Sequence, residues 1–256
     1  MISIKEQIDA LDPNKSINLV LGGGALKGAA HVPLLEYLEE RKIKVNAISG
    51  TSAGALVGAL YGSGKTPKEI LDFFLETPIF KYAWLTPFSN GMFNSMKYQK
   101  YFEAHIRKTF KELDFPLHVC ATNMSRSESV YFNEGQLYHK LLASCAVPGI
   151  FKPVLIDDEM YSDGAVMDNF PLLPFDNDDK LIIGSFLRAP VPVLTKALKS
   201  KRKVIVRSVV LQRQEIEREK LLLPDISIIH DLNHFSAFKQ KDVMKIYQKS
   251  KDSYFS

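Results

Sequence analysis

Hydrophobic residues along this chain occur either in short unbroken runs or at helical spacing. Ile17–Leu21 and residues 45–49 are short apolar runs that lead into glycines, which predicts two buried strands. Between them, apolar side chains recur every three to four positions over residues 32–38, with charged residues on the opposite face. This spacing predicts an amphipathic helix, with Pro33 in its first turn, where the missing N–H costs least.

The alternation of strands and helices continues to the C-terminus. Small residues over 53–61 predict a second helix, and Thr66, Pro67 and Glu69 form a capping box that predicts the start of a third. Further strands are expected at 118–123, 129–132 and 180–186, a helix at 136–144, and a final helix with inward-facing Phe235, Phe238, Val243, Ile246 and Tyr247. This order predicts an α/β fold whose mostly parallel sheet is covered on both faces. No repeat or linker divides the chain, so we expect a single domain over residues 1–256.

The composition is that of a globular protein, with 46% hydrophobic and 24% charged residues. Cys120 and Cys145 are too few for a disulfide framework and lack the spacing of metal ligands, which favours a reducing compartment. The first residues do not resemble a signal peptide. The uncharged stretch 45–64 contains polar residues and five glycines, so we do not interpret it as a transmembrane helix. We therefore expect a cytoplasmic protein.

The net charge of +4 is unevenly distributed. Residues 188–220 contain ten Lys or Arg and three Glu. Such a segment could attract anionic lipid headgroups or nucleic acid, but a solvated basic helix face is the simpler interpretation. We expect no nucleic-acid partner, and peripheral contact with an anionic membrane surface, through residues 196–207, stays a hypothesis.

A glycine-rich loop, Gly22-Gly23-Gly24-Ala25-Leu26-Lys27-Gly28, follows the first predicted strand. Its bare backbone N–H groups can bind a phosphate or a developing oxyanion. The loop does not fit a dinucleotide fingerprint or a Walker A loop, because glycine and lysine stand at the wrong positions. Residues 59–66 lack the first glycine of a P-loop and follow a helix, so nucleotide binding is not expected there either.

The second motif, Gly50-Thr51-Ser52-Ala53-Gly54, lies at a predicted strand-to-helix turn. A nucleophilic serine on such a strained elbow needs small neighbours, and the following helix directs its positive end at the reacting centre. The third motif is Asp163-Gly164-Ala165, which alone is no more than a turn.

The order of these motifs resembles the patatin-like phospholipases. The runs around residues 143–153, before the aspartate, and 169–171, after it, are also similar to that family, and the resemblance covers residues 17–172. It implies a three-layer α/β/α sandwich that hydrolyses lipid acyl esters with a Ser–Asp dyad. Residues 173–256 would complete the sheet and add C-terminal helices.

The resemblance also implies a role for each motif residue. Ser52 would be the nucleophile, Asp163 its base, and the amides of Gly23, Gly24 and Ala25 the oxyanion hole. Lys27 stands where many members have arginine, and Ala25 where some have glycine. The supporting motif positions are Gly22, Lys27, Gly28, Gly50, Gly54, Gly164 and Ala165.

Such a site would need neither a metal nor another cofactor, and its substrate would be a lipid or other acyl ester. An alternative is a Ser-His-Asp triad, because His230 and His234 follow Asp163 in the order of an α/β-hydrolase. An acyltransferase would use the same acyl-enzyme, and a silent lipid-binding module ranks last. The aromatic and Met-rich residues 79–96 could form a mobile cap over an acyl channel or a buried helical cover, and the sequence leaves both open.

Overall fold

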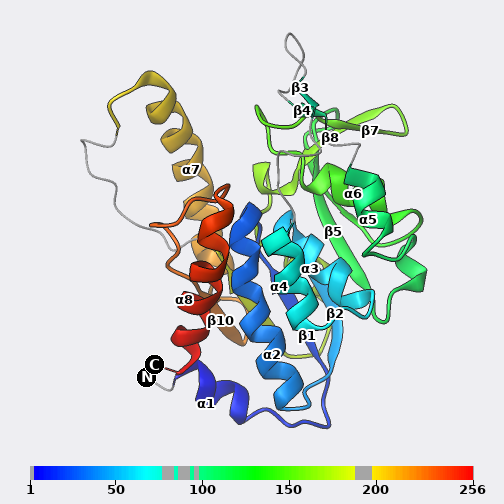
Figure 1. The fold of residues 1–256 in the computed structure, drawn as a ribbon, viewed down its shortest axis with the longest axis vertical. Helices are drawn as coiled ribbons and strands as arrows, with labels where there is room; N and C mark the ends of the chain where they lie inside the picture. The colour runs from blue at the N-terminus through cyan, green and yellow to red at the C-terminus, as the bar shows by residue number, and fades with distance from the viewer. Residues whose placement is uncertain (1–2, 77–83, 86–92, 95–97, 188–197, 256) are drawn as a thin grey trace.

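A central sheet organises the protein (Figure 1). The computed structural model describes all residues except 1–2, 77–83, 86–92, 95–97, 188–197 and 256. The eight strands of the sheet are β1 (Ile17–Leu21), β2 (Val45–Thr51), β5 (Leu117–Asn123), β6 (Glu128–Phe132), β7 (Val154–Ile156), β8 (Glu159–Asp163), β9 (Ile182–Phe186) and β10 (Ile226–Ile229). Their order is β10-β9-β1-β2-β5-β8-β7, and β6 also pairs with β5.

One side of the sheet is parallel and the other is antiparallel. From β10 through β9, β1 and β2 to β5, every pairing is parallel. Strands β6 and β8 both run antiparallel to β5, and β7 runs antiparallel to β8. The expected mostly parallel sheet is confirmed, with an antiparallel margin that the hydrophobic pattern did not predict.

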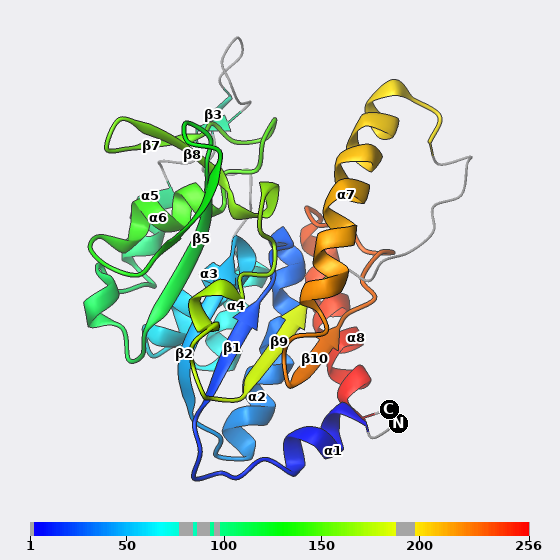
Figure 2. The ribbon, with the colours of Figure 1, turned by 180° about the vertical axis from the view of Figure 1, so that it is seen from behind.

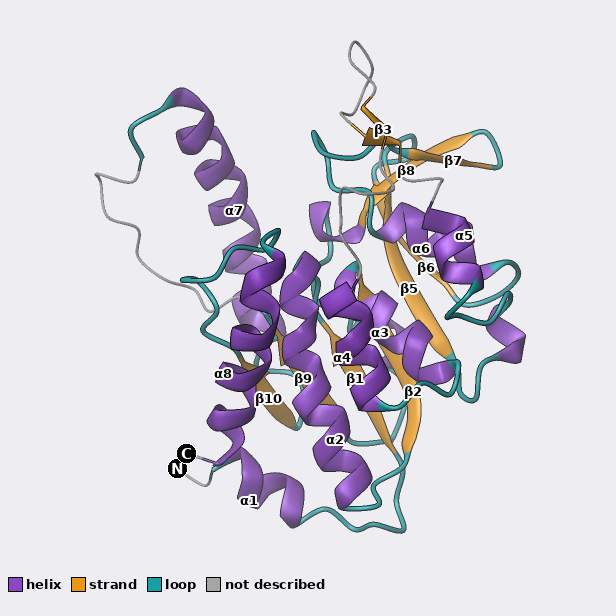
Figure 3. Ribbon diagram, in the orientation of Figure 1, coloured by secondary structure: helices purple, strands orange, loops and turns teal. Residues whose placement is uncertain are grey.

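The two faces of the sheet are covered unequally (Figure 3). The helices are α1 (Ile4–Asp9), α2 (Val32–Glu40), α3 (Ala53–Gly62), α4 (Pro67–Glu76), α5 (Tyr98–Glu103), α6 (Leu137–Ser144), α7 (Lys201–Lys220) and α8 (Val243–Phe255). Helices α2, α3, α4 and α8 lie on one face, over the larger hydrophobic core. The smaller core on the other face contains Phe170, Phe175 and Phe186, and the short 3₁₀ helix η5 (Leu173–Phe175) crosses there (Figure 2).

Most predicted elements are confirmed, and the capping box is present. The Thr66 hydroxyl accepts the Glu69 N–H, and the Glu69 carboxylate accepts the Thr66 N–H at 2.9 Å. The last helix was predicted too early: α8 begins only at Val243, because Phe235 and Phe238 lie in the turns before it. A 3₁₀ helix, η1 (Ala25–His31), also precedes α2, with Pro33 in the first turn of α2 as expected.

Residues 79–96 lie largely outside the described residues. Only β3 (Trp84–Leu85) and β4 (Phe93–Asn94) are described there, and they pair with each other antiparallel. Among the helices that the structure describes, none is both long and apolar enough to cross a membrane.

Candidate active site

Ser52 occupies a sharp turn between β2 and α3. Its backbone has φ 52° and ψ −115°, a left-handed conformation that is strained for a residue with a side chain. A Cβ atom at Gly50 would lie 2.5 Å from the Ala55 nitrogen, and one at Gly54 would lie 2.0 Å from the Leu21 carbonyl oxygen. Both glycines of the motif are therefore required by close backbone packing. This is the geometry of a nucleophile elbow.

Ser144 supports the elbow from α6. The Ser52 N–H donates to the Ser144 hydroxyl at 2.8 Å, and that hydroxyl donates to the Cys120 carbonyl at 2.6 Å. Ser144 is fully buried, so the hydroxyl satisfies two backbone groups that water does not reach. Sequence reasoning assigned Ser144 no role, because only the folded chain places α6 beside the elbow.

The sheet brings the end of β8 to the end of β2. Strand β6 pairs with β5 over Val119–Asn123, so β2 and β8 must share the opposite edge of β5. Thr51, the last residue of β2, faces Cys120, and Asp163, the last residue of β8, faces Ala121. The two strands thus approach each other end to end, and the residue after β2 is Ser52.

The Asp163 carboxylate is buried, with 3% of the residue exposed. Its Oδ1 atom accepts the Ala165 N–H at 2.8 Å, which caps the 3₁₀ turn η4 (Gly164–Val166) and orients the side chain. Residue 164 must be glycine, because a Cβ atom there would lie 2.5 Å from the Cys120 carbonyl oxygen. The Asp-Gly-Ala motif is therefore a tight cap packed directly against β5.

Cys145 lies beside both residues, although sequence reasoning gave it no role at the site. Burial, together with the negative charge of Asp163, raises the pKa of the Cys145 thiol to about 12, and a hydrogen bond with the Ser52 side chain opposes that shift. The thiol is therefore neutral at physiological pH. The Asp163 N–H also donates to the carbonyl of Ala146, the residue after Cys145, at 3.0 Å, so the end of α6 connects the elbow with the end of β8.

The glycine loop lies against the same region. A Cβ atom at Gly23 would be 3.1 Å from the Ser52 Cβ. The Gly23 N–H donates to Asn169 Oδ1 at 3.1 Å, so a buried side chain already occupies this expected oxyanion donor. The N–H groups of Gly24 and Ala25 donate to none of the residues that the structure describes. Ala25 has φ 52°, which turns the chain into η1.

The late histidines do not contact Ser52. His230 is buried, and its two ring nitrogens lie 3.0 Å from the Ser185 hydroxyl and 3.3 Å from the Ser250 hydroxyl. Burial lowers the pKa of His230 to about 3, so its ring is neutral. His234 is exposed on the loop after β10. The arrangement therefore gives no support to the Ser-His-Asp alternative.

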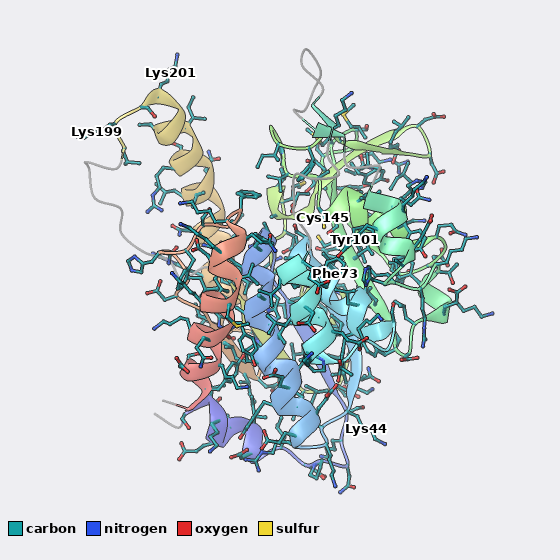
Figure 4. The ribbon with its side chains drawn as sticks, in the orientation of Figure 1. Lys44, Phe73, Tyr101, Cys145, Lys199 and Lys201 are labelled. Carbon is teal, nitrogen blue, oxygen red and sulfur yellow. The ribbon has the colours of Figure 1, made fainter. Side chains whose placement is uncertain are left out.

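A pocket with about 720 Å³ of empty space, counting its open mouth, begins at Ser52. Apart from Ser52 and Cys145, every described residue of its wall is apolar. Five phenylalanines line it, from α4, α5, the segment after α6 and the segment before α8: Phe73, Phe74, Phe102, Phe151 and Phe238. Figure 4 shows Phe73 and Cys145 close together in the middle of the molecule. Such a wall suits an apolar chain.

The family described as "Patatin-like phospholipase" matches residues 19–176, which is more than half of the chain. The chain belongs to the patatin-like phospholipase family. The matched region contains the glycine loop, the elbow and the Asp163 motif, whereas Phe238 and His230 lie beyond it.

Relatives support this membership. The chain is 30% identical over 171 residues to "Lysophospholipase nte1" of Emericella nidulans, covering 60% of this chain and 11% of the relative. It is 29% identical over 168 residues to an uncharacterised NTE family protein of Mycobacterium bovis, covering 62% of this chain and 45% of that protein. The chain thus corresponds to only a part of each of these relatives.

A solved structure supports the fold. The crystal structure of VipD from Legionella pneumophila matches with a TM-score of 0.60 and 15% identity, covering 94% of this chain and 66% of that chain. At this identity the likeness concerns the fold alone. It extends beyond the family match and includes the C-terminal part of the chain, as expected of a patatin-like α/β sandwich.

No group of three or more His, Cys, Asp or Glu residues that could hold a metal ion occurs within the described part of the chain.

Proposed function

We propose that this chain is a serine acyl hydrolase that cleaves lipid acyl esters through Ser52 and Asp163. One observation carries the proposal: the hydroxyl on the elbow opens into an apolar pocket, while the strand that ends in Asp163 arrives at the same point. The apolar wall would hold the acyl chain, and the ester carbonyl would then lie at Ser52. Family membership and the lysophospholipase names of relatives agree with a lipid ester as substrate.

Asp163 has the properties of a general base for this reaction. Its carboxylate is buried, and the Ala165 N–H holds Oδ1 in a fixed position, as a general base that must reach the serine hydroxyl requires. Asp163 takes the Ser52 proton as Oγ attacks the carbonyl carbon. The proton passes to the leaving alcohol as the C–O bond breaks, and the acyl group stays on Ser52. Asp163 then takes a proton from water, the resulting hydroxide attacks the acyl-enzyme, and the proton returns to Ser52 as the fatty acid leaves.

The negative oxygen that forms in each step needs donors. The N–H groups of Gly24 and Ala25 supply them, and the N-terminus of α3 adds a positive partial charge behind Ser52. Each well-aimed donor stabilises the transition state by about 3–4 kcal/mol. Gly23 becomes a third donor only if Asn169 releases its N–H.

Labelling with a fluorophosphonate carrying an alkyl chain tests the proposal. We expect wild type to be labelled at Ser52 and Ser52→Ala to be unlabelled and inactive on a panel of esters of graded chain length. Ser127→Ala is the matched control, because Ser127 is an exposed turn serine with a similar φ of 61°. Labelling that persists in Ser52→Ala would overturn the proposal. Adding an acceptor alcohol and analysing the products separates hydrolysis from acyl transfer.

Helix α7 is the part of the chain that we propose contacts the lipid surface. It projects from the body in both ribbon views (Figures 1 and 2). Its outward side chains include Val204, Ile205, Leu211 and Ile216, each between 47% and 57% exposed, while Gln214 and Glu217 are buried. The exposed residues of α7 also include the polar side chains of Lys201, Ser208, Gln212, Arg218 and Glu219, so its outward side is mixed. Such a face suits a helix at the boundary between lipid headgroups and acyl chains.

The positive charge at the tip of α7 indicates which kind of lipid surface the helix would bind. Lys199 and Lys201 stand at the outer end of the helix (Figure 4) and are exposed. Lysines beside exposed apolar side chains favour lipids with anionic headgroups. We expect wild type to bind vesicles containing phosphatidylserine more tightly than phosphatidylcholine vesicles at low salt, with the difference reduced at high salt. Equal binding to both would contradict this, and a dimer that forms through α7 would replace it.

A further inference from the structure

We propose that His31 is a positioning residue which, together with Asn169, holds the Gly22–Gly23 peptide and thereby directs the Gly24 and Ala25 amides at the oxyanion. The inference rests on the function proposed above and assigns the glycine loop a fixed orientation. His31 lies at the end of η1 and is fully buried.

His31 and Asn169 bind the carbonyl and the N–H of the same peptide unit. His31 Nε2 lies 2.9 Å from the Gly22 carbonyl oxygen, and Asn169 Oδ1 accepts the Gly23 N–H at 3.1 Å. These two backbone groups belong to the same planar peptide and point in opposite directions. Holding both prevents the plane from rotating. At its other end the loop is set by Ala25, which at φ 52° leads directly into η1. The two amides that follow Gly23 are therefore held between two fixed points, which an oxyanion hole requires before the charge develops.

A chain of buried side chains supports His31 from behind. His31 Nδ1 lies 2.8 Å from the Ser185 hydroxyl on β9, which lies 3.0 Å from His230 Nε2. His230 Nδ1 lies 3.3 Å from the hydroxyl of Ser250 on α8, which also donates to the Ala30 carbonyl at 2.7 Å. All four side chains are at most 4% exposed. This series of contacts between side chains therefore connects α8 and β9, both outside the family match, to the glycine loop.

The Gly22 carbonyl sets the direction of the protons between His31 and His230, whereas the single Ser250 proton goes to the Ala30 carbonyl and is not shared with His230 Nδ1. A carbonyl can only accept, so His31 Nε2 carries the proton and Nδ1 must accept from the Ser185 hydroxyl. Ser185 then accepts from the His230 Nε2–H. Burial keeps both rings neutral by lowering the pKa of His31 to about 4 and that of His230 to about 3. The Gly22 carbonyl thus fixes the His31 tautomer, and the Ser185 hydroxyl holds the other ring nitrogen by donating to it.

His31 does not act as the base in place of Asp163. Both of its ring nitrogens are engaged, one by the Gly22 carbonyl and one by Ser185. It also does not line the pocket that begins at Ser52. Its effect on the reaction passes through the backbone of the loop, and this distinguishes it from a residue that touches the substrate.

Two substitutions at His31 distinguish the effect of losing its hydrogen bond to Gly22 from the effect of disturbed packing. His31→Leu removes the donor to Gly22 but keeps an apolar side chain of similar bulk, whereas His31→Gln retains an N–H near the position of Nε2. We expect kcat on a soluble ester to fall by roughly 10- to 100-fold in His31→Leu with KM nearly unchanged, and to recover to within a few fold of wild type in His31→Gln. His118→Leu, a half-buried histidine on β5, is the matched control and keeps wild-type kcat.

Inhibitor affinity gives a readout that a merely structural role would not move. A lipid trifluoromethyl ketone forms a tetrahedral oxyanion on serine, whereas the parent methyl ketone binds largely without doing so. We expect His31→Leu to lower the ratio of their affinities by at least about tenfold, as for a lost oxyanion interaction. An unchanged ratio in a folded variant would overturn the proposal. If His31→Leu fails to fold, Ser185→Ala removes the hydroxyl that holds His31 Nδ1, and the same ratio decides.

The outcomes distinguish this inference from the proposed function. If wild type is not labelled at Ser52, the proposed hydrolase mechanism fails. If wild type is labelled but His31→Leu and Ser185→Ala keep the wild-type kcat and inhibitor ratio, only the positioning role fails.

Discussion

The glycine loop and helix α7 are built in opposite ways. Polar side chains from distant parts of the chain hold the loop, with Asn169 bonded to Gly23 and His31 to Gly22. Helix α7 instead presents half-exposed apolar side chains to solvent. Hydrogen bonds are directional and suit the aiming of backbone amides, whereas apolar contact is not directional and suits a fluid surface. Under the proposals above, the first region would determine the rate of the reaction and the second would determine where the protein binds.

One ion pair joins the two regions. Lys220, at the end of α7, lies 2.7 Å from the carboxylate of buried Asp168, which also accepts the Tyr131 hydroxyl at 2.7 Å. The Asp168 carbonyl accepts the Thr51 hydroxyl at 2.8 Å, next to Ser52. The projecting helix is therefore anchored to the segment that carries both Asp163 and Asn169.

The largest effect is expected at Asp163, which ends β8 at the same point as the elbow. Asp163→Asn keeps the shape of the side chain but removes its basicity, so kcat should fall by about 10²–10⁴-fold in a soluble-ester assay. Vesicle binding should stay unchanged, because α7 is untouched. Asp176→Asn, in an exposed position, is the control. Near-normal turnover of Asp163→Asn would require a different base.

The glycines of the elbow offer a stability test. In Gly54→Ala the new Cβ would lie 2.0 Å from a backbone oxygen that cannot move aside, and we expect the free energy of unfolding to fall by about 3 kcal/mol or more. Gly62→Ala, at the other end of α3, meets nothing closer than 3.4 Å and should be neutral or stabilising by up to about 1 kcal/mol. Urea unfolding of both variants measures this. Equal effects would show that close packing does not determine the Gly-x-Ser-x-Gly pattern.

Lowering the pH should reduce the free energy of unfolding through His31, which supports the glycine loop. His31 binds its proton in the unfolded chain near pH 6.5 but in the folded protein only near pH 4, so unfolding takes up a proton between these values and stability falls as the pH drops. Between pH 7 and 5 this amounts to about 2 kcal/mol for His31. His230, whose ring centre is 6.5 Å from that of His31, acts in the same direction, with Tyr254 packed behind it. His31→Gln should show a smaller loss over this range, measured by chemical unfolding at both pH values.

The smallest effect is expected on the projecting helix. Ile205→Ser should weaken binding to phosphatidylserine vesicles by roughly three- to tenfold, because about one apolar side chain no longer enters the lipid. Its kcat on a soluble ester should match wild type. Met244→Ser, which alters an exposed apolar residue on α8, is the control and should bind vesicles normally. A loss of turnover in Ile205→Ser would remove the distinction between the two regions.

Local patterns in the sequence predicted the elements that carry the first two motifs. The strand before the glycine loop, the strand and helix around Ser52, and the Thr66 cap are all present as predicted. Each depends on neighbours a few residues apart, so a short stretch of sequence contains the necessary information. The final helix was placed too early because Phe235 and Phe238 have a helical spacing but pack from turns. A buried, helically spaced apolar residue can therefore lie either in a helix or in the irregular segment before one.

The sequence by itself determined where the first strands, the helices that follow them and the Thr66 cap begin, since each follows from residues a few positions apart. Only the tertiary structure decided that β8 ends against β2, that the Leu21 carbonyl excludes a side chain at Gly54, that Asn169 takes the Gly23 amide, and that the Gly22 carbonyl fixes the tautomer of His31. These contacts join segments far apart in the chain. Their partners are chosen by the packing of the whole sheet and its helices, and no local pattern contains that choice.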